Sequence, residues 1–299
     1  MYAQFFGNYL LSRNVVTAEQ LVQALGQLST EHVKMGTLAI HEGYMTATEV
    51  EQVLILQTHQ DKRFGELAVE IGLLSEDEVL SLLKTQGPDF LLLGQIFVEN
   101  NIITNQELEN LLVDYQSENE LIELDITTEQ KESIQKLIER FFLTAERPIS
   151  NLDSKYIALF FNNLIRFIGD DFTPATPTLC REYPVNFCVS QKINGSYSLR
   201  SYLDMDESTA IAFASRYVDD DFDEFDEYVR ASLDDFLNLH NGLFNVNLSN
   251  ESSLELSLEP PAVVEENLLI FDDDAFLIPI IFPFGTIHFI LSFESSNES

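Results

Sequence analysis

Apolar and polar positions in residues 1–118 repeat with a period of 29 residues. Four glycines lie in register at this interval: Gly7, Gly36, Gly65 and Gly94. Seven residues after each of them stands Asn or another Gly: Asn14, Gly43, Gly72 and Asn101. Asn and Gly best tolerate the left-handed conformation that ends a helix. Each repeat is therefore predicted to contain a short helix that the chain enters near the first glycine and leaves at the second position.

A second helix is predicted in every repeat, three residues further along the chain. It opens with the Ser/Thr-x-x-Glu/Gln pattern of a capping box: Thr17 and Gln20, Thr46 and Glu49, Ser75 and Glu78, Thr104 and Glu107. Apolar residues at i and i+4 follow: Leu21 and Leu25, Val50 and Leu54, Val79 and Leu83, Leu108 and Leu112. One helix pair cannot bury such a stripe, so we expect the units to stack. The first glycine then serves either tight packing or close approach of a ligand.

The two middle repeats resemble the MshEN-type domain at the N-terminus of type II secretion and pilus ATPases, which binds cyclic di-GMP. That motif has a basic residue before a Gly, a second Gly and a closing Gln, as in Lys34 to Gln57 and Arg63 to Gln86. The resemblance implies a site for cyclic di-GMP made by Lys34, Gly36, Gln57, Arg63, Gly65 and Gln86. Repeats 1 and 4 lack the basic residue and the Gln, and look like caps.

An alternative for the array is a plain set of stacked helix pairs with a solvated Lys34 and Arg63. The chain also lacks the G-x-x-x-x-G-K-[ST] motif of the ATPase that usually follows an MshEN-type module. We therefore expect the module to be attached to something other than an ATPase.

The periodicity stops near residue 118, and residues 119–152 are predicted to form a linker and a connecting helix. A second domain is predicted over residues 153–293, followed by a tail, 294–299. Its expected helices lie at about 156–168, 207–217 and 225–241, and its expected strands at about 186–190, 197–203, 276–282 and 286–293. Asn194-Gly195 signals a hairpin, whereas the acidic run 272–274 is expected to be a solvated loop. The fold class predicted is α+β, with all-α repeats followed by a domain containing an antiparallel sheet.

The longest helix of this second domain carries Asp235, Asn238 and Gly242 at i, i+3 and i+7, on one face. This pattern resembles the signature of CheX-like chemotaxis phosphatases, and the resemblance covers residues 153–293. It implies that Asn238 orients water against the aspartyl phosphate of a response regulator, while Asp235 pairs with the regulator's active-site Lys. The family normally has Glu at the position of Asp235. A domain that binds partners without hydrolysis therefore remains an alternative.

Composition narrows the classes of partner. Sixteen basic and fifty acidic residues give a net charge of −34, which disfavours nucleic acid and anionic membrane surfaces. No apolar run reaches the length of a signal peptide or a membrane span, so a cytoplasmic protein without membrane insertion is expected. The five His residues show no ligand spacing, and we expect no metal and no intrinsic cofactor. Cys180 and Cys188 are expected to be buried as small hydrophobic side chains.

Three hypotheses for function follow. The first is a signalling protein in which the array senses cyclic di-GMP or docks a partner, while the CheX-like domain binds and dephosphorylates a phosphorylated response-regulator receiver domain. The second is a non-enzymatic signalling adaptor with a degenerate phosphatase domain. The third is a dinucleotide receptor without enzymatic activity. A homodimer is among the assemblies that the sequence allows.

Overall fold

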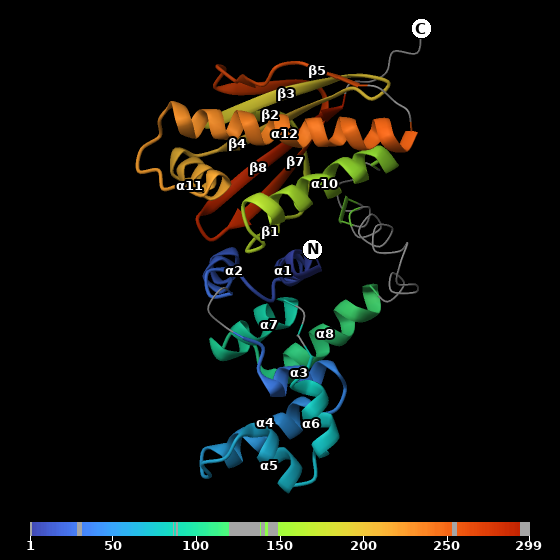
Figure 1. Ribbon diagram of the computed structural model, residues 1–299, viewed down its shortest axis with the longest axis vertical. Helices are drawn as coiled ribbons and strands as arrows, with labels where there is room; N and C mark the ends of the chain where they lie inside the picture. The colour runs from blue at the N-terminus through green and yellow to red at the C-terminus, as the bar shows by residue number, and fades with distance from the viewer. Residues whose placement is uncertain are drawn as a thin grey trace. The chain divides into compact units, whose positions relative to one another are not determined.

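The computed structural model describes residues 2–28, 32–85, 87, 89–119, 138, 141–142, 149–252 and 256–293. The chain divides into two compact units between Asp125 and Ile126. The first unit is helical, and the second combines helices with an antiparallel sheet (Figure 1). The α+β class predicted from the sequence is confirmed. The predicted linker, 119–152, lies largely outside the described residues, and the predicted tail, 294–299, lies entirely outside them.

Helices of the first unit follow the four repeats in pairs. They are α1 (Tyr2–Ser12), α2 (Ala18–Leu25), α3 (Met35–His41), α4 (Ala47–Gln57), α5 (Phe64–Glu70), α6 (Glu76–Leu82), α7 (Asp89–Glu99) and α8 (Asn105–Asn119). The predicted helix ends are confirmed, because φ is positive at Asn14 (54°), Gly43 (70°), Gly72 (77°) and Asn101 (56°). A left-handed residue at the same place in every repeat gives each repeat the same tight turn between its two helices.

The predicted capping boxes are also present in all four repeats. The hydroxyls of Thr17, Thr46, Ser75 and Thr104 accept from the backbone N–H three residues ahead, at 3.1–3.3 Å. The side chains of Gln20, Glu49, Glu78 and Glu107 accept in return from the backbone N–H of the cap residue, at 2.7–2.8 Å. These bonds satisfy N–H groups that have no partner within the helix, and thereby fix where each second helix begins.

Gly36, Gly65 and Gly94 lie where two helices approach each other closely. A Cβ atom at Gly94 would come within 2.5 Å of Leu108, and one at Gly36 within 2.9 Å of Val50. Between repeats 2 and 3 the contact is reciprocal: a Cβ at Gly36 would lie 3.3 Å from Phe64, and one at Gly65 would lie 3.1 Å from Met35. Of the two roles that the sequence left open for these glycines, this geometry supports tight helix packing.

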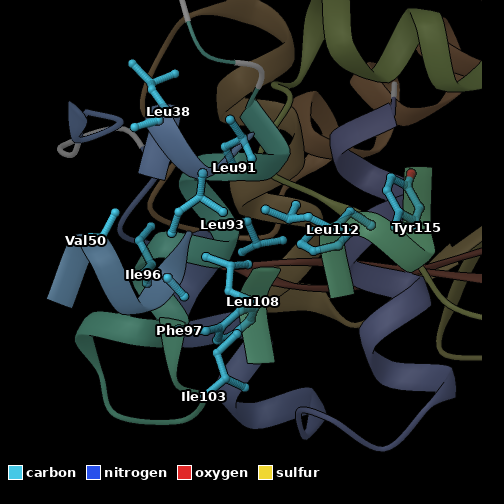
Figure 2. Packing of buried hydrophobic residues seen from close by; sticks show 14 of the residues in the cluster. Leu38, Val50, Leu91, Leu93, Ile96, Phe97, Ile103, Leu108, Leu112 and Tyr115 are labelled. Carbon is cyan, nitrogen blue, oxygen red and sulfur yellow. The ribbon is translucent and has the colours of Figure 1, made fainter. Parts of the chain in front are cut away.

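The repeats do not stack in sequence order. Helix α1 packs on α7, which joins repeats 1 and 4, whereas α3 and α4 pack on α5, which joins repeats 2 and 3. Contacts of α7 and α8 with α3 and of α8 with α4 connect the two pairs. Figure 2 shows the resulting core, with residues of repeats 2 and 4 in one cluster that includes Leu38, Val50, Ile96, Phe97 and Leu108. The two repeats expected to be separate caps therefore lie against each other.

The apolar stripe is buried unevenly. Its two positions are buried in repeats 1 and 4: Leu21, Leu25, Leu108 and Leu112. In repeats 2 and 3 the second position is exposed, by 43% at Leu54 and 67% at Leu83. The expectation that stacking buries the apolar stripe of every repeat is wrong at these two positions. Leu54 lies on α4 and lines a groove to which residues of repeat 4 also contribute, whereas Leu83 is the residue that follows α6.

The second unit places three helices on one face of an antiparallel sheet (Figure 1). Its helices are α10 (Asn151–Phe167), α11 (Glu207–Val218) and α12 (Glu227–Ser252). Its strands are β1 (Thr173–Pro174), β2 (Thr178–Pro184), β3 (Phe187–Gly195), β4 (Leu199–Met205), β5 (Leu256–Leu258), β6 (Ala262–Val263), β7 (Leu268–Phe282) and β8 (Gly285–Phe293). The main strand order is β1-β7-β8-β4-β3-β5, with β2 on β7 and β6 on β3.

Several local predictions hold and others change. The hairpin at Asn194-Gly195 joins β3 to β4, with Ile193 opposite Leu199. Residues 272–274, expected to be a loop, lie within β7, and α12 extends well past its predicted end at 241. The helix continues because Phe244 and Leu248 prolong its buried stripe, and Gly242 keeps a helical place without crowding. Cys188 is buried, Cys180 is half-buried, and both thiols are free.

A histidine lies in the aromatic core between α12, α10 and β8. The side chain of His240 is fully buried, with its ring centroid 4.5 Å from that of Tyr156, 5.2 Å from that of Phe160 and 6.1 Å from that of Phe289. Its Nδ1 atom lies 3.2 Å from Nδ2 of Asn163. Burial lowers the pKa of His240 to about 3, because the imidazolium would lose its hydration. The ring is therefore neutral in the folded protein.

This burial predicts an acid-sensitive free energy of unfolding. The unfolded chain takes up a proton at His240 near its ordinary pKa of about 6.5, whereas the folded chain does not. Stability should therefore fall by about 1.4 kcal/mol per pH unit as the pH decreases below about 6.5. Urea unfolding of the wild type and His240→Phe at pH 7.5 and 5.0 isolates this contribution, because both proteins share the other titrating groups. An equal pH dependence in the two proteins would contradict the prediction.

Candidate functional site

Two polar side chains stand on the solvent-facing side of α12. Asp235 and Asn238 are both exposed, one turn apart, and Gly242 is half-exposed one turn further. They face outward because the alternate face of the helix is apolar and buried: Val229, Leu233, Phe236, Leu237, Phe244 and Leu248. The amphipathic pattern that folds α12 onto the sheet therefore also presents a carboxylate and a carboxamide side by side.

The Asp235 carboxylate is held by a residue of the neighbouring helix. Tyr217 of α11 donates its hydroxyl hydrogen to Oδ2 of Asp235, over 2.6 Å. The Tyr217 ring packs against Phe236 at 5.5 Å and Phe167 at 6.0 Å between centroids. Burial of the phenol, together with its bond to the carboxylate, raises the pKa of Tyr217. The phenol thus remains a donor and ties one carboxylate oxygen to the protein's own surface.

The Asn238 carboxamide is held by a hydrogen bond from a residue of the sheet. Its Oδ1 atom accepts a hydrogen bond of 2.8 Å from Nε2 of Gln191, a residue of β3 that is only 1% exposed. Side chains alternate along β3, and Gln191 lies on the face that the helices cover. Sequence reasoning missed both Gln191 and Tyr217. Each is remote in sequence from the residue that it holds, and neither belongs to a recognisable motif.

A buried polar network continues beneath the helix. Asn241 donates from Nδ2 to Oε1 of Gln191 at 2.8 Å and to Oγ of Ser201 at 3.3 Å. Tyr156 of α10 donates to Oδ1 of Asn241 at 2.6 Å. Because Asn241 and Tyr156 are fully buried, these bonds satisfy groups that cannot reach water. The network explains why α12 carries a polar residue at an interior position.

In the first unit, three of the six residues assigned to ligand binding line one groove. This cavity of about 480 Å³ is lined by Lys34, Gly36 and Gln57, together with apolar side chains that include Leu54 and Phe64. Its described lining does not include Arg63 or Gly65, and Gln86 lies outside the described residues. The two basic residues that the sequence assigned to one ligand are thus not brought together in this groove.

The charge of Lys34 is balanced locally. Its Nζ atom lies 2.7 Å from Oε1 of Glu99 on α7, and its backbone N–H donates to Oε1 of Gln95 at 2.6 Å. Gln57 donates from Nε2 to the carbonyl oxygen of Lys62 at 3.2 Å. A Lys paired with a carboxylate attracts an anion less strongly than an unpaired one. The groove therefore combines apolar walls with a neutralised ion pair.

Two classes of feature are absent from the residues that the structure describes. Across these ranges, no three His, Cys, Asp or Glu side chains gather closely enough to hold a metal ion. Within the same ranges, no helix has both the length and the apolar character needed to cross a membrane.

Comparison with known proteins gives similarity at the level of solved structures. No family model matches the chain, and no curated protein matches it. A chemotaxis protein CheX from Desulfovibrio desulfuricans is 15% identical, covering 48% of this chain and 100% of that one, with a TM-score of 0.42. CheX from Vibrio vulnificus gives the same four values. The CheX–CheY–BeF3–Mg complex from Borrelia burgdorferi is 18% identical, covering 48% and 98%, with a TM-score of 0.41. At this identity the likeness to these three structures is one of fold, over about half of this chain.

Proposed function

We propose that the second unit binds a phosphorylated response-regulator receiver domain and hydrolyses its aspartyl phosphate. Asn238 orients the attacking water, and Asp235 pairs with the receiver's active-site Lys. The observation that carries this proposal is the exposed pair on α12, in which each side chain is held by a hydrogen bond from its own domain. A carboxamide and a carboxylate fixed one turn apart supply one neutral group for water and one anionic group for a cation.

The chemistry suits these two groups. Water forms a bond to phosphorus while the bond between phosphorus and the aspartyl oxygen breaks, and the receiver's own metal ion stabilises the charge that develops. A partner protein therefore needs to supply only position and hydrogen bonds. The Oδ1 atom of Asn238 retains a second lone pair, and its NH2 group keeps both hydrogens for the bound receiver, since Gln191 occupies only one lone pair.

An adaptor that binds the receiver without hydrolysis is the second candidate, and the geometry of Asp235 favours it. Asp is one methylene shorter than the Glu expected from the CheX resemblance, and Tyr217 ties one of its oxygens to the protein surface. Both features limit how far the carboxylate can reach into a partner. The two candidates share the same surface and differ only in whether the receiver loses its phosphate faster when bound.

Replacing Asn238 tests hydrolysis directly. We expect Asn238→Ala to lower the rate of receiver dephosphorylation by about a hundredfold, because a preorganised group that acts on the attacking water is lost. The measurement follows loss of radiolabelled phosphate from receiver domains of the same genome. Asn247→Ala, which removes another exposed asparagine of α12, is the matched control and should keep the wild-type rate. Binding of the receiver with no faster decay in the wild type would establish the adaptor instead.

Replacing Asp235 tests the ion pair. We expect Asp235→Asn to weaken binding of the activated receiver about tenfold, since a charge-assisted hydrogen bond becomes a neutral one. Titration calorimetry at two salt concentrations should also show a smaller salt dependence in the variant. Glu227→Gln removes an equal charge from an exposed position of the same helix, so it controls for the long-range field. Equal weakening by both substitutions would mean that Asp235 contributes only to that field.

For the first unit, we propose that the groove around Lys34, Gly36 and Gln57 binds a small ligand, with cyclic di-GMP as the ligand that the MshEN resemblance implies. The juxtaposition of these three residues in one cavity supports this proposal. The apolar walls suit the faces of a base. Lys34 suits a phosphate once its ion pair with Glu99 has opened.

Calorimetric titration with cyclic di-GMP tests the groove through two variants that should change the Kd in opposite directions. Lys34→Ala should raise the Kd about fivefold, whereas Glu99→Gln should lower it, because the ammonium group is then free for a phosphate. Lys84→Ala, at an exposed site outside the groove, should leave the Kd unchanged. An absence of heat at millimolar ligand would exclude the array as a receptor for this dinucleotide.

A further inference from the structure

The buried Gln191 side chain uses both ends of its carboxamide. Its Nε2 donates one hydrogen to Oδ1 of Asn238 and the other to the backbone carbonyl oxygen of Glu259, both at 2.8 Å. Its Oε1 accepts from Nδ2 of Asn241 at 2.8 Å. Gln191 is only 1% exposed, and protein groups accept both of its donor hydrogens.

These partners fix which way the Gln191 amide points. A backbone carbonyl can only accept, so the NH2 group must face Glu259. Turning the amide over would set two oxygens 2.8 Å apart at that contact. On the opposite side, Asn241 is oriented by Tyr156, whose hydroxyl donates to its Oδ1. The orientation of Gln191 is thus determined by groups that do not include Asn238.

The fixed Gln191 amide in turn fixes Asn238. An NH2 group of Gln191 facing α12 requires an acceptor, so Asn238 must present Oδ1 to the sheet and its own NH2 group to the solvent. The reverse orientation of Asn238 would place two donors against each other. We propose that Gln191 is a positioning residue, which selects the edge of the Asn238 carboxamide that the receiver meets.

The effect on rate rests on the proposed phosphatase function, whereas the orientation of Asn238 does not. An exposed Asn side chain without this anchor rotates about its χ angles and turns its amide over, so the group facing the water is correct for only part of the time. Misplacement of about 1 Å in a positioned group can lower a rate by about a hundredfold. Gln191→Met keeps the length of the side chain but removes all of its hydrogen bonds.

The first experiment compares kcat and KM for receiver dephosphorylation. We expect Gln191→Met to lower kcat by about 10- to 100-fold with KM unchanged, since the binding surface itself is intact. Tyr197→Phe is the matched control, because it removes a buried hydrogen bond, the one to Oδ1 of Asp153, that lies outside this network. It should lower the melting temperature and keep kcat within about twofold. Equal losses of kcat in the two variants would reduce Gln191 to a structural role and overturn the proposal.

A double-mutant cycle tests whether Gln191 acts through Asn238. In an Asn238→Ala background, Gln191→Met should lower kcat no further. Gln191→Glu is the second variant in case Gln191→Met does not fold. It keeps the volume but presents an oxygen to Asn238, so kcat should fall there as well. A further drop in the Asn238→Ala background would contradict positioning.

A spectroscopic readout separates this inference from the proposed function. The order parameter of the Asn238 side-chain NH2 group, assigned by its disappearance in Asn238→Ala, should be high in the wild type and in Tyr197→Phe and low in Gln191→Met. A wild type without phosphatase activity would end the proposed function, while this measurement would still decide whether Gln191 orders Asn238. An unchanged order parameter in Gln191→Met would overturn the inference.

Discussion

A helix that carries amides on both of its faces must satisfy the buried ones, and this requirement governs the second unit. Asn241 of α12 is fully buried, and its bonds to Gln191 of β3, Ser201 of β4 and Tyr156 of α10 connect the helix to three other elements. Leaving such a group unpaired costs about 1–3 kcal/mol, so sliding or rotating α12 is penalised by several such losses at once. The apolar stripe holds the helix on the sheet, and the network fixes its register there.

The fixed register of α12 also fixes the position of the exposed pair, Asp235 and Asn238. Asn238 lies three residues before Asn241, and the same Gln191 side chain contacts both. Asp235 is anchored from α11 through Tyr217. A site placed on a helix whose rotation is fixed from beneath loses little side-chain entropy when a partner binds, because its groups are already ordered. In the first unit, packing rather than polar bonding provides the precision, through glycines that let helices cross closely.

What the sequence could predict follows from the range of each interaction. Capping boxes and left-handed turns are formed by residues within one turn of each other, and these were predicted residue by residue in all four repeats. The pairing of α1 with α7 depends on surfaces far apart in sequence, so the sequence predicted that the repeats stack but not which of them are neighbours. Residues 272–274 read as a loop because they are acidic, yet they lie in β7, which pairs with β2, and Asp274 binds Arg181 there.

The same limit explains which residues around the two candidate sites could be predicted from the sequence. Asp235 and Asn238 share a helix, and their spacing alone places them on one face. Gln191 and Tyr217 are recognisable only once strand alternation and helix packing are known, since each acts through a single long-range bond. In the repeats, the internal register paired Lys34 with Arg63, but Lys34 instead meets Glu99 from the fourth repeat, which no register between neighbouring repeats could indicate.

Charge sets a final condition on any phosphoryl chemistry by this chain. With a net charge of −34, the protein repels an anionic phosphate at long range. A carboxylate placed next to the phosphoryl group would add to that repulsion, whereas the Asn238 carboxamide is neutral and offers both donor and acceptor. The anionic Asp235 lies one turn away and is held by Tyr217. In the proposed function it meets a cation and not the phosphate. Under the proposed function, this acidic protein thus presents a neutral side chain to the phosphoryl group and keeps a charged one for a cation.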